Sequence, residues 1–225
     1  MKYVVSNEKK NFSKNKIFIF FLILSLAFFL PKWLISYFYF PNEDLTFKII
    51  SDSHKDSYYY FHYIKSLSNL SFNNLFLSNI TSPNLMPIPY GSIIFHTILF
   101  KIIGISSFIV LEYVCVFIFL YVFYLIFLKL NFKNNFSILL ASFFLCLPLI
   151  FSLLGNIGIA EIRTFSDHFY NLRFPRPLIA NLFFFIFIYL MLISVDQNPF
   201  DLKIIILFSL ILALSFSSFF FIFVI

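Results

Sequence analysis

The chain is poor in charged residues, in glycine and in cysteine, and each shortage excludes a class of protein. Only 12% of its residues are charged and 61% are hydrophobic, whereas a soluble domain carries about twice that share of charge. Its four glycines form no glycine-rich loop of the kind that cradles nucleotide phosphates. Cys115 and Cys146 both lie in apolar runs, where a structural disulfide is not expected. These shortages indicate a polytopic helical membrane protein.

The net charge of +6 does not indicate a nucleic-acid partner, because its distribution is better explained by membrane topology. Five of the thirteen lysines precede the first apolar run: Lys2, Lys9, Lys10, Lys14 and Lys16. Such a basic segment predicts that residues 1–16 form a cytoplasmic tail. The protein is therefore expected to be an integral, multi-pass protein of a bacterial inner membrane.

The hydropathy pattern predicts an all-α fold, with about five transmembrane helices in a single domain over residues 17–225. The first helix runs from Ile17 to the high thirties. It is read as an uncleaved anchor, because no signal-peptidase site follows it. The other four spans cover residues 105–128, 136–155, 178–195 and 202–225, and Pro148 is expected to kink the third span. Because no tail follows the last span, we expect the sequence to be the N-terminal portion of a larger protein.

Two long polar segments, about 41–104 and 156–177, are expected to be loops on the outer side of the membrane. Within the first loop, Tyr60, Tyr63, Ile64 and Leu67 repeat at helical spacing and predict an amphipathic surface helix over 56–67. A proline-rich stretch, 82–91, is followed by a short apolar segment that ends at Gly104. Its thirteen residues predict a second surface helix, since a span needs about twenty. The alternative is that 92–128 forms two spans with a hairpin at Gly104.

The second loop contains every arginine of the chain: Arg163, Arg173 and Arg176. A guanidinium group presents a planar fork of donors that matches two phosphate oxygens, whereas a lysine acts as a point charge. We therefore predict that the three arginines bind a phosphate group. Snorkelling of the same side chains to lipid headgroups is the alternative.

Asp52 and Asp56 are four residues apart, so they would share one face of a helix. A carboxylate there could accept a proton from a sugar hydroxyl or hold a divalent metal ion. The alternative is that Asp52 caps a helix and Asp56 complements its first turn. Lys55, in the same segment, is included among the candidate substrate-binding residues.

Glu112 and His96 are two further candidates. Glu112 lies about 10 Å below the start of the second span, and an acid at that depth costs a few kcal/mol unless it is paired or hydrated. His96 could reach it from the preceding segment, and so could Arg163. The four histidines show no metal-binding spacing such as H-E-x-x-H, so no metal site is assigned.

In its order of segments, the chain resembles the start of the C-type membrane glycosyltransferases, which use polyprenyl-phosphate-linked sugars. The matching segments are 52–65, 83–91 with His96, and 100–104. The chain departs from the family in having two separated aspartates in place of a single acid or an Asp-Glu pair, and in having fewer spans.

The resemblance implies that a sugar is transferred from a polyprenyl-phosphate donor on the non-cytoplasmic face. Asp56 or Asp52 would then act on the acceptor, and the arginines would stabilise the leaving lipid phosphate. The partners expected are therefore the lipid bilayer and a polyprenyl-phosphate-linked sugar. A multi-pass transporter or lipid flippase, or a membrane subunit without catalysis, are the alternatives. A transporter would show glycine-interrupted helices in paired repeats. Gly155 and Gly158 are a weak sign of such an interruption, but the sequence shows no internal repeat.

Overall fold

The computed structural model describes residues 14–39, 44, 55–70, 90–156, 178–196 and 202–218, and every regular element within them is a helix. The predicted all-α fold is thus confirmed for these residues. The elements are α1 (Lys14–Tyr39), α3 (Lys55–Ser68), α4 (Tyr90–Ile103), the 3₁₀ turn η2 (Gly104–Ser106), α5 (Ser107–Lys129), α6 (Asn134–Asn156), α8 (Leu178–Asp196) and α9 (Leu202–Ser218).

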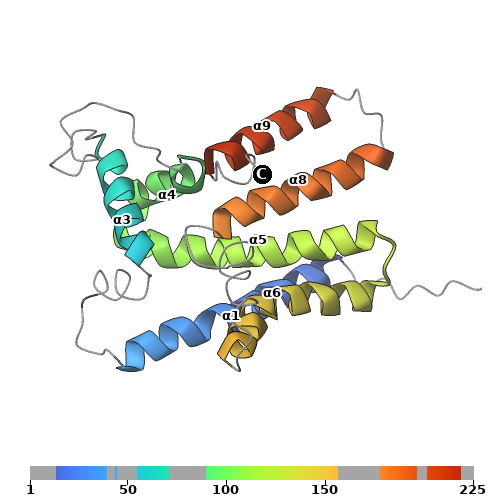
Figure 1. Ribbon diagram of the computed structural model, residues 1–225, viewed down its shortest axis with the longest axis horizontal. Helices are drawn as coiled ribbons and strands as arrows, with labels where there is room; N and C mark the ends of the chain where they lie inside the picture. Colours follow the sequence, from blue (N-terminus) through green and yellow to red (C-terminus); the bar gives the residue numbers. More distant parts are fainter. Residues whose placement is uncertain are drawn as a thin grey trace, which may run out of the picture.

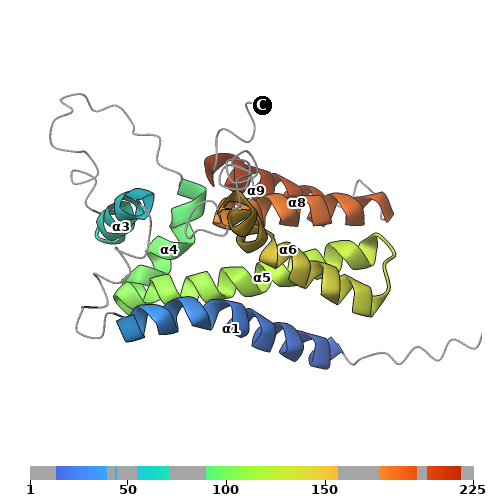
Figure 2. The same ribbon diagram turned by 60° about the horizontal axis from the view of Figure 1, so that its bottom comes forward.

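Helix α5 is the centre of the bundle. Helices α1, α6 and α8 each pack along it, and α9 packs on α8 and α4 (Figures 1 and 2). The α5 side chains Phe119 and Leu120 have no exposed surface, and Phe123 is only 2% exposed. The ring of Phe123 lies 4.5 Å from that of Phe185 on α8 and 5.2 Å from that of Phe144 on α6. The phenylalanines of this helix therefore hold its neighbours together.

Helices α1 and α5 run in opposite directions. Phe21, near the start of α1, packs on Tyr124 near the end of α5, with ring centroids 5.0 Å apart. Farther along α1, Phe29 packs on Tyr113 near the start of α5 at 5.4 Å. Helix α1 continues through Pro31, as the sequence predicted for an anchor extending into the high thirties.

A tight turn between α5 and α6 reverses the chain. The N–H of Asn131 bonds to the carbonyl of Leu128 and the N–H of Phe132 bonds to that of Phe127, at 3.1 Å each. Asn131 has a φ of +65°, the left-handed conformation that asparagine tolerates better than most residues. The rings of Phe127 and Phe132 also touch, with centroids 6.0 Å apart. This is a Schellman cap, and it explains why α6 folds back onto α5 at the turn expected after residue 128.

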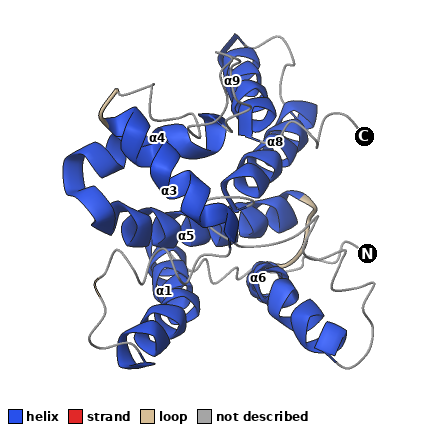
Figure 3. Cartoon of the chain, turned by 60° about the vertical axis from the view of Figure 1, so that its left-hand side comes forward, coloured by secondary structure: helices blue, strands red, loops and turns tan. Residues whose placement is uncertain are grey.

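Gly104 interrupts the helical conformation between α4 and α5. Its φ of +62° belongs to the left-handed region, and the chain changes direction there so that α4 folds back against the start of α5 (Figure 3). The predicted helix ending at Gly104 is confirmed as α4. Its 14 residues are about 21 Å long, shorter than the apolar thickness of a bilayer.

Close backbone packing joins α4 to α9. A Cβ atom added at Gly91 would overlap the carbonyl oxygen of Leu214 and the hydroxyl of Ser218. The hydroxyl of the neighbouring Ser92 has no exposed surface and donates to the Ser218 carbonyl at 3.5 Å. Small residues allow this approach, as they do between helices in membranes.

Five described helices coincide with the five apolar segments of the sequence: α1, α5, α6, α8 and α9. By length and composition, three helical stretches could cross a membrane: Asn15–Tyr39, Tyr90–Lys129 and Leu178–Val195. Two shorter apolar stretches are Asn134–Leu147 and Leu202–Ser218. Large apolar side chains are exposed on their outer faces, among them Ile23, Leu139 and Ile206, each about 60% exposed. Such surfaces are compatible with contact with a lipid bilayer.

Candidate functional site

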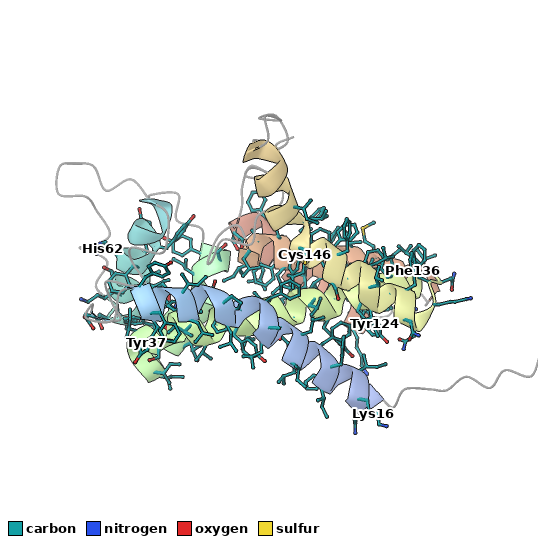
Figure 4. All side chains as sticks on the ribbon, turned by 90° about the horizontal axis from the view of Figure 1, so that it is seen from below. Lys16, Tyr37, His62, Tyr124, Phe136 and Cys146 are labelled. Carbon is teal, nitrogen blue, oxygen red and sulfur yellow. The ribbon has the colours of Figure 1, made fainter. Side chains whose placement is uncertain are left out.

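The two ends of the bundle carry different side chains. Figure 4 shows Tyr37 of α1 and His62 of α3 at one end, and Lys16 of α1 and Phe136 of α6 at the other. The first end, here called the α3 end, gathers the last turns of α1, all of α3 and the junction of α4 with α5. The described candidate residues of the sequence lie in or beside these elements.

His96 is completely buried between α4 and the start of α5. Its Nε2 atom lies 3.2 Å from the hydroxyl of Ser107, which is also completely buried. The imidazole also packs edge-on against Phe108, with ring centroids 3.9 Å apart. His96 therefore lies inside the protein, and the fold of the chain at Gly104 provides its polar contact.

Glu112 is buried between α5 and α1, with only 7% of its surface exposed. The indole N–H of Trp33 donates to its Oε2 atom at 3.2 Å. Phe108 and Glu112 are four residues apart and share one face of α5, so Glu112 lies one turn beyond the contact with His96. The structure thus places Glu112 within the first two turns of α5 and His96, on α4, against the same two turns.

Helix α3 covers this region. Tyr60, Phe61 and Ile64 are each at most 8% exposed. The ring of Phe61 lies 5.8 Å from that of Phe108 and 6.3 Å from that of Phe100. The predicted amphipathic helix is therefore confirmed, and its apolar face includes Phe61, which the sequence pattern did not assign to it. This face packs against α4 and the start of α5.

The remaining predicted site residues are only partly placed. Lys55 and Asp56 form the first turn of α3, and the structure describes their backbone. Asp52, Arg163, Arg173 and Arg176 lie outside the described residues. Among the residues that the structure describes, no group of three or more His, Cys, Asp and Glu side chains could hold a metal ion.

Three residues of this region were not predicted as part of a site: Trp33, Ser107 and Phe108. No pattern in the sequence marks Ser107 or Phe108 as functional. For Trp33 the interaction joins positions 79 apart in the chain, and no local pattern reports such a pair. The nearest signal was Glu112 itself, since an acid within an apolar helix needs a partner.

The chemistry available here is that of a buried carboxylate and a buried imidazole. Both groups can accept or donate a proton. Glu112 is on α5 and accepts a hydrogen bond from Trp33 of α1, whereas His96 is on α4 and lies against the start of α5. Comparison of the chain with protein-family models, with curated proteins and with solved structures finds no match.

Proposed function

We propose that this protein is a membrane glycosyltransferase that takes a sugar from a polyprenyl-phosphate donor at the α3 end of the bundle. This end would face away from the cytoplasm, because the lysine-rich residues 1–16 favour a cytoplasmic N-terminus. The membrane would be a bacterial inner membrane.

The observation that supports this proposal best is the packing of α3. The helix that begins with Lys55 and Asp56 is held through Phe61 against Phe108, the residue on which His96 packs. An acid-bearing amphipathic helix is thereby fixed beside a buried histidine and a buried glutamate at one end of an apolar bundle. A substrate with a polar head and an isoprenoid tail fits such an end.

In this proposal, three groups of residues have different roles in the reaction. Asp56 or Asp52 accepts a proton from the acceptor hydroxyl or holds a divalent metal ion. Arg163, Arg173 and Arg176 stabilise the negative charge that develops on the leaving lipid phosphate. His96, Glu112 and Lys55 contribute to binding of the donor.

Alanine substitution of Asp52, Asp56 and Arg173 in the full-length gene tests the proposal. We expect the variant of the catalytic aspartate to lower sugar transfer by about 100-fold or more, the usual contribution of a general base. Surface glycan would fall while lipid-linked sugar accumulates, and both can be measured in the same cells. His62→Ala, an exposed change on α3, serves as the control and should leave transfer intact.

Unchanged glycan in all three variants, at normal protein levels, would exclude this enzymatic function. If the protein is instead a transporter, the variants should stop movement of the lipid-linked sugar and not its transfer. In that case, sugar transfer in inverted membrane vesicles would continue in the variants, whereas movement of the lipid-linked sugar across the membrane would stop.

A further inference from the structure

The end of the bundle opposite α3 contains a small hollow between α1 and α6. Its volume is about 140 Å³, and it is lined by Lys16, Ile17 and Phe20 of α1 and by Asn135 and Ile138 of α6. Both helices pack on the same side of α5 and diverge from one another (Figure 3). An engineered apolar cavity of about 150 Å³ holds a benzene molecule, so this hollow has room for part of a hydrocarbon chain.

The walls of the hollow are fixed by contacts among the three helices. Phe21 of α1 packs on Tyr124 of α5, with ring centroids 5.0 Å apart. The hydroxyl of Tyr124 donates to the Oδ1 atom of Asn134 at 2.6 Å, which ties the first residue of α6 to α5. The Schellman cap over 127–132 fixes the same corner. These contacts hold both walls of the hollow against α5.

The polar rim of the hollow is positively charged, whereas its walls are apolar. Lys16 lies in the lining, and Lys133 precedes Asn135 by two residues. Lys129 is the last residue of α5, so it lies in the same α5–α6 turn as Lys133. Lys16, Lys129 and Lys133 are all exposed. Neither α1 nor the segment 129–156 contains an aspartate or a glutamate. The charged residues of these two segments are therefore all lysines.

The surroundings of the hollow are suited to lipid. Beside its lining residues, Ile19 on α1 is 55% exposed and Leu139 on α6 is 60% exposed. A basic pocket between apolar helices, at the end where the lysines gather, is the usual recognition site for an anionic lipid headgroup. A free phosphate ion would use the lysine but not the apolar walls.

We propose that the hollow between α1 and α6 binds one anionic phospholipid. The phosphate of the lipid contacts Lys16 at the rim, and an acyl chain lies against Ile17, Phe20 and Ile138. This site lies at the opposite end of the bundle from the proposed catalytic residues, so it does not depend on the glycosyltransferase function.

Binding can be measured with the purified full chain in detergent micelles, by titration with phosphatidylglycerol or phosphatidylcholine and native mass spectrometry. We expect phosphatidylglycerol to bind in preference to phosphatidylcholine. Lys16→Gln should weaken that binding about fivefold, which corresponds to the ~1 kcal/mol that one lysine contributes near an anionic lipid surface. Lys203→Gln is the matched control, because Lys203 is also an exposed lysine near a helix start but does not line the hollow.

Two further experiments distinguish binding of a whole lipid from binding of its phosphate group alone. Ile138→Trp fills the hollow without changing charge and should reduce binding of phosphatidylglycerol to the level of phosphatidylcholine. Inorganic phosphate at tens of millimolar should not displace the lipid. Equal affinities in the Lys16→Gln and Lys203→Gln variants would overturn the proposal. So would displacement by inorganic phosphate, or full binding by a folded Ile138→Trp variant.

Discussion

At the scale of single residues, the contact between Trp33 and Glu112 is the most informative in the bundle. A glutamate that is 7% exposed has lost most of its water, so each protein donor to its carboxylate matters more than it would at the surface. The indole N–H supplies one donor, and the Trp33 side chain is partly buried against the apolar core. The pair therefore joins two helices through a polar contact in a largely apolar interface.

Replacing Trp33 with phenylalanine should lower the free energy of unfolding by about 1 kcal/mol, because Glu112 loses a hydrogen-bond donor while an aromatic ring remains. Reversible unfolding in mixed detergent micelles measures the change. Tyr39→Phe also removes a polar hydrogen from α1, at a side chain that is 77% exposed, and should change stability by less than about 0.5 kcal/mol.

A double-mutant cycle attributes this loss to the hydrogen bond. In a Glu112→Leu background the carboxylate is absent, so Trp33→Phe should cost much less than it does in the wild type. Equal costs in both backgrounds would show that Trp33 stabilises the bundle through packing alone.

At the scale of elements, α3 is the helix on which the proposed function depends most. It is short, with 14 residues, and its polar residues would make it marginal as an isolated helix. Its buried face supplies the missing stability, since Phe61 packs between Phe100 and Phe108. The position of Asp56 at its first turn is consequently set by aromatic packing one turn later.

Phe61→Ala should release α3 from α4 and α5. Truncation of a buried phenylalanine costs about 3–5 kcal/mol, which is enough to open a single peripheral helix. Hydrogen exchange followed by mass spectrometry should show faster exchange in peptides covering 55–68, with little change in α8 and α9.

His62→Ala is the control at the adjacent position, because His62 is exposed. It should leave the exchange rates of α3 nearly unchanged. If Phe61→Ala also leaves them unchanged, α3 is held by other contacts, and the link between its packing and the placement of Asp56 is lost.

At the scale of the whole molecule, the two ends of the bundle differ in composition. Lys16 and the turn holding Lys129 and Lys133 lie at one end, and Tyr37 and His62 lie at the other (Figure 4). The proposed orientation, with the lysine-rich turn in the cytoplasm, is based on this difference. A lipid-linked sugar is accordingly proposed to bind at the α3 end and an anionic phospholipid at the Lys16 end.

Accessibility labelling tests this orientation. In a background with Cys115 and Cys146 replaced by alanine, a cysteine at position 62 should react with an impermeant maleimide added outside intact spheroplasts. A cysteine at position 133 should react only after the membrane is opened. Reaction of both cysteines from the same side would refute the orientation and, with it, the proposed site of sugar transfer.

The general class of the protein could be predicted from sequence because it depends on local properties. Low charge, long apolar runs and 3.6-residue periodicity predicted an all-helical fold, and the helices begin and end close to the expected residues. The change of direction in the ribbon of α6 near Cys146 (Figure 4) also agrees with the kink expected at Pro148, two residues later. Gly104, which has a left-handed backbone conformation, follows the last residue of α4, as the end of the apolar pattern predicted.

Only the tertiary structure decided which helices meet. Nothing local in the sequence shows that Trp33 reaches Glu112, that Gly91 lies against the backbone of α9, or that Phe61 belongs to the buried face of α3. These contacts join segments far apart in the chain, and they are selected by shape and by hydrogen-bonding partners rather than by hydropathy, which is nearly uniform over the apolar helices. The sequence by itself thus determined the class of protein and its helices, whereas packing around α5 determined which polar side chains lie together, because only folding brings those distant side chains into contact.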